Sequence, residues 1–121
     1  MEKGQLIKDN INFLNEYIPK LINAIEREVE NLIANNETEA FRLLPNIFEG
    51  MEWTVRAINS IQELGFIEGI DLDNINSILE ELSQAFQRKD YVLISDLFQY
   101  EIIEILLDWN EKVSLIKGEY N

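Results

Sequence analysis

The feature that most constrains the fold is the spacing of apolar residues in the first third of the chain. From Leu6 to Leu32 they recur at steps of three and four residues, which is the period of one face of an α-helix. Asn36 then interrupts the pattern, and Asn36 followed by Glu39 has the form of a capping box for a second helix. The spacing therefore predicts one helix over about 6–34 and a second helix that begins near Asn36.

The rest of the chain shows the same period. The second helix is expected to end at Gly65, because glycine readily takes the left-handed conformation found after helices. Asp73 is a suitable cap for a short third helix over about 74–88, and Asp90 is one for a fourth helix over about 91–116. Three long helices and one short helix, joined by brief connections, predict an all-α, up-down four-helix bundle.

Composition limits the classes of function. The chain has 121 residues, which fits a single domain over residues 1–121, and it contains neither cysteine nor histidine. We therefore expect no thiol nucleophile, no histidine base, no catalytic residue that can be named and no cofactor. Its 23 acidic and 10 basic residues give a net charge of −13, which disfavours nucleic acid and membrane surfaces as partners.

The sequence also bears on the location and the origin of the protein. The first residues lack the apolar core of a secretory leader, and no window is long and apolar enough to span a bilayer, so we expect a cytoplasmic protein. Isoleucine and asparagine are abundant and alanine is scarce, a bias that indicates AT-rich coding DNA and hence a bacterial source.

The fourth predicted helix is unusual because it is apolar on two sides. Its core stripe is expected to consist of Ile94, Phe98, Ile102, Ile105, Trp109, Val113 and Ile116. The opposite side carries a second set, Leu93, Tyr100, Ile103 and Leu107, where a helix facing solvent normally has polar residues. Trp53 poses the same problem on the second helix, because it projects away from that helix's core stripe and is flanked by small residues.

Two interpretations remain open for these residues. In the first, the fourth helix is central in the bundle, and Trp53 lies under a loop such as 65–73. In the second, Leu93, Tyr100, Ile103, Leu107 and Trp53 form an exposed patch that closes a homodimer or receives an amphipathic segment of another protein.

Two stretches resemble a known group of proteins. The run DLFQYEIIEILLDW, in which a tryptophan follows a Tyr-Glu pair by eight residues, and the stretch NIFEGMEWTV are similar to segments of small, acidic, all-helical proteins of unknown function in Gram-positive anaerobes. This resemblance implies a helical fold across most of the chain and a bacterial source. It implies no activity.

Carboxylates are the abundant reactive groups that remain. Glu49 and Glu52 are one helical turn apart on the second helix, and Glu101, Glu104 and Asp108 follow one flank of the fourth. Such pairs on facing helices hold Mg²⁺ in all-α nucleotide pyrophosphatases, so a Mg²⁺-dependent hydrolase of that kind is the alternative function. The simpler interpretation is a solvated acidic face, and with it we expect no metal.

The function that we expect is therefore a protein–protein interaction module, an adaptor or a chaperone-like bundle. Its partner would be a second copy of the chain or another protein, bound through the apolar side of the fourth helix.

Overall fold

The computed structural model describes residues 2–116, with side chains from residue 4 onward; residue 1 and residues 117–121 of the predicted domain lie outside that part. Within it the chain is all-α, as predicted. The helices are α1 (Glu2–Ile33), α2 (Glu37–Glu63), α3 (Leu72–Gln87), α4 (Tyr91–Asp96), η1 (Leu97–Ile102) and α5 (Ile103–Ser114). The last three are continuous, and we call them together the C-terminal helix.

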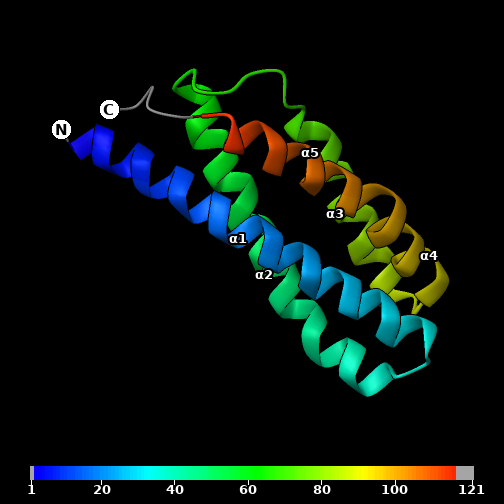
Figure 1. Ribbon diagram of the computed structural model, residues 1–121. Coiled ribbons are helices and arrows are strands. Elements are labelled where there is room, and N and C mark those ends of the chain that lie inside the picture. The colour runs from blue at the N-terminus through cyan, green and yellow to red at the C-terminus, as the bar shows by residue number, and fades with distance from the viewer. Residues whose placement is uncertain (1, 117–121) are drawn as a thin grey trace.

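Successive helices run in opposite directions, which confirms the predicted up-down bundle of four helices (Figure 1). The two longest, α1 and α2, pack against each other along their length, and the C-terminal helix returns beside α1. The short helix α3 packs mainly on α4 and η1. None of the helices in residues 2–116 combines the length and the apolar character needed to cross a lipid bilayer.

The caps differ from the predictions at two of three sites. Asp90 caps the C-terminal helix as expected, since its Oδ1 accepts a hydrogen bond from the backbone N–H of Leu93 at 3.2 Å. The third helix starts earlier than predicted, at Leu72, and its cap is Asp71 rather than Asp73. The sequence offered two aspartates in the same turn, and Asp71 is the one whose extended backbone lets its Oδ1 reach two helical N–H groups.

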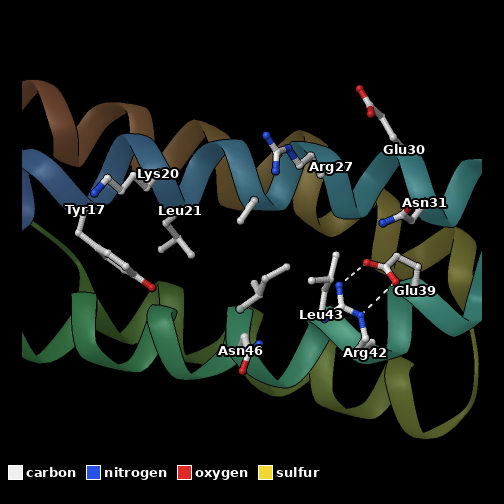
Figure 2. Close-up of a pocket in the computed structure, with 12 residues that line it drawn as sticks. Tyr17, Lys20, Leu21, Arg27, Glu30, Asn31, Glu39, Arg42, Leu43 and Asn46 are labelled. Atoms are coloured by element: carbon white, nitrogen blue, oxygen red, sulfur yellow. Dashed lines mark hydrogen bonds and ion pairs between the residues drawn. The ribbon is translucent and has the colours of Figure 1, made fainter.

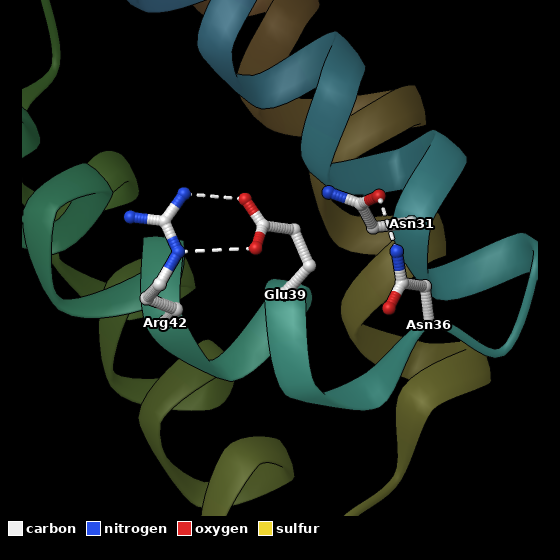
Figure 3. A network of polar contacts seen from close by, with 4 residues as sticks. All are labelled: Asn31, Asn36, Glu39 and Arg42. Carbon is white, nitrogen blue, oxygen red and sulfur yellow. Dashed lines mark hydrogen bonds and ion pairs between the residues drawn. The ribbon is translucent and has the colours of Figure 1, made fainter.

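The predicted capping box at Asn36 and Glu39 does not form. Asn36 lies at the N-cap position, but its side chain makes no capping hydrogen bond. Figure 3 shows the partners that these side chains take instead: Asn36 donates to the Asn31 side chain, and Glu39 accepts from Arg42. The box is therefore replaced by two separate contacts, each made with a side chain that lies within five residues.

A π-helical segment, η1, interrupts the C-terminal helix and was not predicted. The N–H of Ile103 bonds to the carbonyl of Phe98, five residues back, so the segment contains one more residue than an α-helical turn holds. The extra residue rotates the helix that follows. As a result Leu106 is buried, whereas Ile105, which was expected in the core stripe, is only half-buried.

The buried residues form a core of mainly isoleucine and leucine side chains, with three polar exceptions. Ser95 is one, and Thr54 is another, whose hydroxyl donates to the backbone carbonyl of Gly50 at 2.8 Å. Glu28 on α1 is the third, and among the described residues it alone has buried side-chain oxygens without a hydrogen-bond partner. A buried acid in this state costs folding free energy unless it takes up a proton.

Candidate functional site

The second apolar side of the C-terminal helix is partly exposed. Tyr100 is 66% exposed and Leu107 is 48% exposed, whereas Leu93 and Ile103 are half-buried and pack against the core. The interpretation that this helix is wholly enclosed by its neighbours is therefore wrong for two of the four residues. The sequence identified the correct side of the helix but not which of its residues would remain open.

Tyr100 lies at the edge of a hollow of about 600 Å³, which we call the end hollow. It lies between the C-terminal end of α1 and the α4 and η1 segments. The lining residues are Leu32, Ile33, Asn35, Lys89, Asp90, Tyr91, Val92, Ser95, Asp96, Gln99 and Tyr100. The hollow thus joins parts of the chain that are about sixty residues apart in sequence.

Two large apolar residues of the end hollow were not predicted. Ile33 is 66% exposed and Val92 is 73% exposed, so with Tyr100 they present three open apolar side chains around one depression. A signal was available in the sequence. Ile33 follows Leu32 of the first helix's apolar face, and Val92 precedes Leu93 of the second apolar set. Consecutive residues of a helix point in different directions, so neither Ile33 nor Val92 belongs to the face of its neighbour. Only the packing of α4 beside α1 brings Ile33 and Val92 together.

The rim of the end hollow carries charges of both signs, from Lys89, Asp90 and Asp96. Tyr91, which also lines the hollow, has a pKa raised above its ordinary value by burial and by the nearby carboxylate of Glu37. Like any tyrosine hydroxyl at neutral pH, it is protonated and can donate a hydrogen bond. An apolar surface with aromatic residues and a mixed polar rim is typical of a protein-binding site.

Trp53 belongs to a different surface. It is 48% exposed and lines a small hollow with Asn10 and Phe13 of α1 and with three residues of its own helix. No described residue of the loop 65–73 lines that hollow, so the interpretation that this loop covers Trp53 is wrong. The flanking Gly50 serves another contact, because it is buried against Tyr17.

The five candidate metal ligands do not form one site. The negative charge of Glu49 acts on Tyr17 of α1, whereas Glu52 lines a depression between α2 and α3. Glu104 and Asp108 lie together beside the loop that precedes α3, and Glu101 is exposed one turn away on η1. Asp108 is engaged by Lys112, whose Nζ lies 2.9 Å from its Oδ2.

The same conclusion holds for acidic side chains elsewhere in the described part of the chain. Across residues 4–116, no group of three or more is placed to hold a metal ion. The antiparallel helices needed for a paired-carboxylate centre are present, but the acidic residues point to different grooves. Helical spacing gave the correct distances along each helix, yet it did not fix the direction in which each helix presents its acids.

One family model matches the chain. It is described as "Domain of unknown function (DUF8042)", and it matches residues 9–112, which cover most or all of each of the four helices and include both stretches quoted for the resemblance above. No curated protein and no solved structure matches the chain at a significant level.

Proposed function

The chain belongs to the DUF8042 family, and we propose that it is a protein–protein interaction module that binds through the end hollow and the adjoining face of the C-terminal helix. The observation that carries this proposal is the exposure of Ile33, Val92 and Tyr100 around one depression. Leu107, seven residues further along the same helix, is also exposed. Scattered apolar residues are normal on a protein surface, but a cluster around a depression is typical of a binding site.

The shape of the surface favours a helical partner segment. A depression at the junction of two helices can accept side chains that recur every three or four residues on an amphipathic helix. The exposed tyrosine supplies a large contact area at a small cost in conformational entropy, which suits an anchor residue.

The net charge of the chain distinguishes a homodimer from a complex with a basic partner protein. Two copies of a chain with net charge −13 repel each other, so a homodimer should become tighter as salt screens that repulsion. A basic partner would be attracted by the same charge, and its complex should weaken as salt rises. The sign of the salt dependence therefore identifies the class of partner.

The experiment is a mass measurement by light scattering at low and high salt, followed by affinity capture from a cell extract if the protein is monomeric. The double substitution Tyr100→Glu and Leu107→Glu should abolish the association while the helical circular dichroism signal is retained. The matched control is Gln84→Glu with Gln87→Glu, which adds the same charge at exposed positions of α3. Association that survives in the double variant at the level of the control would refute the proposal.

A further inference from the structure

A second hollow of about 600 Å³ lies between α1 and α2, and we call it the α1–α2 groove. Figure 2 shows its lining residues, which come from the second half of α1 and the first half of α2. The groove shares no residue with the end hollow. Its floor is apolar and is formed by Leu21, Ala24, Leu43 and Ile47.

The groove gathers positive charge in a strongly acidic protein. Lys20, Arg27 and Arg42 line it, which are three of the ten lysine and arginine residues of the whole chain. Lys20 and Arg27 are seven residues apart on α1, so they lie on the same side of that helix and about 10 Å apart along its axis. Neither forms an ion pair with any residue in the described part of the chain.

The acidic residues at the groove do not cancel these two cations. Glu39 is occupied by the guanidinium of Arg42, whose Nε donates to its Oε2 at 3.0 Å. Glu30 also lines the groove, but its carboxylate is directed away from α2 (Figure 2) and forms no ion pair with a described residue. Two unpaired cations therefore remain above an apolar floor.

Tyr17 lines the same groove. Partial burial, and to a smaller extent the carboxylate of Glu49, raises the pKa of its hydroxyl. The carboxylate of Glu49 disfavours an anion at Tyr17 itself, so the acidic group of a ligand is better placed beside Lys20 and Arg27.

We propose that the α1–α2 groove binds a small amphipathic organic acid, with its acidic group between Lys20 and Arg27 and its apolar body on the floor. The volume lies within the range of roughly 300 to 1,000 Å³ that is common for small-molecule sites. The free cations provide the charge complementarity, and the apolar floor selects an organic acid over a small inorganic anion.

The floor also favours a narrow ligand over a docked helix. Leu21 and Ile47 are themselves buried, so the groove offers only a thin strip of apolar surface to a ligand. A helix would bring large side chains to this strip and would need a broader apolar face. The large exposed apolar residues, such as Tyr100 and Leu107, lie outside the α1–α2 groove.

The test uses three probes with the same ten-carbon chain, each kept below its micelle concentration: decanoate, uncharged decyl maltoside and the decyltrimethylammonium cation. Amide chemical shifts of ¹⁵N-labelled protein report where each probe binds. We expect decanoate to shift amides within 17–31 and 39–47, with a dissociation constant at least tenfold lower than those of the other two probes. Equal affinity of all three probes, or decanoate shifts confined to the end hollow, would overturn the proposal.

A charge reversal completes the test. Lys20→Glu combined with Arg27→Glu should weaken decanoate binding at least tenfold. The matched control is Lys8→Glu with Arg88→Glu, which changes the net charge by the same amount at exposed positions outside the groove. Equal loss of binding in both double variants would show that only the overall charge matters, and would also refute the groove as the site. Because Tyr100 and Leu107 remain intact in both, the result is independent of the proposed interaction module.

Discussion

Replacing Glu28 with glutamine should make the stability of the bundle less dependent on pH. The Glu28 side chain is 0% exposed, and neither of its carboxylate oxygens has a hydrogen-bond partner. Burial raises its pKa from the ordinary value of 4.5 to about 7; the negative charge of Glu39 adds to this effect, and the side-chain amide of Asn31 opposes it. The folded protein therefore holds a proton that the unfolded chain releases between these two pH values.

The sign and size of the effect follow from linkage. Below pH 4.5 the carboxyl is protonated in both states and contributes nothing. Between pH 4.5 and about 7 the carboxyl ionises in the unfolded chain but stays protonated in the folded protein. Ionisation therefore stabilises the unfolded state, and the free energy of unfolding falls as the pH rises. With about 1.4 kcal/mol for each pKa unit, the cost is roughly 1 kcal/mol at pH 5.5 and roughly 3 kcal/mol at pH 8.5. Glutamine cannot ionise, so Glu28→Gln removes this cost.

The assay is urea unfolding followed by circular dichroism at pH 5.5 and at pH 8.5, both well above the sequence pI of about 4.2. The difference in free energy of unfolding between Glu28→Gln and wild type should increase by about 2 kcal/mol between the two pH values. Glu26→Gln, at an exposed position of the same helix, is the matched control and should show no such increase. A difference that stays constant with pH would refute the assignment of a raised pKa to Glu28.

Two further predictions concern close packing and helix register. A Cβ added at Gly50 would clash with the hydroxyl oxygen of Tyr17. Gly50→Ala should therefore be about 1 kcal/mol less favourable in wild type than in a Tyr17→Phe background, measured as a double-mutant cycle by urea unfolding. Gly4→Ala, where nothing lies within 4 Å, should show no such coupling. Deletion of the exposed Gln99 should remove the extra residue of η1 and leave a continuous α-helix with the melting temperature nearly unchanged. Deletion of the exposed Glu111 in α5 should instead turn the buried residues that follow it away from the core. It should therefore lower the melting temperature by several degrees. Equal effects of the two deletions on the melting temperature would contradict this account.

The period of the apolar residues was sufficient to predict the bundle. Steps of three and four specify helices, and short connections at 34–36 and 88–90 leave antiparallel packing as the simple arrangement. The one longer connection, 64–71, is held by Gln62, whose side-chain amide donates to the carbonyl of Ile70 and accepts from its N–H. Such a contact depends on the path of the loop in space, so no local pattern could have indicated it.

The candidate surface was predicted only in part, for a geometric reason. Tyr100 and Leu107 were identified because both are apolar on a side of one helix that should face solvent, which is a property of local sequence. Ile33 and Val92 contribute to the same surface only because α1 ends beside the start of α4. The pair of cations at Lys20 and Arg27 was not predicted as part of a site for a similar reason. The groove that they line exists only once α2 packs against α1.

The two strongest departures from local rules lie next to the two proposed sites. Glu28 is buried beside Asn31 and Glu39, which line the α1–α2 groove, and the π-helical segment includes Tyr100 of the end hollow. A buried acid costs stability and a π-helical segment departs from regular helix geometry, and proteins commonly retain such features where function requires them. If Glu28→Gln stabilises the protein at pH 8.5 and also changes decanoate affinity, the buried acid is linked to the groove; if it changes stability alone, its cost is confined to the core.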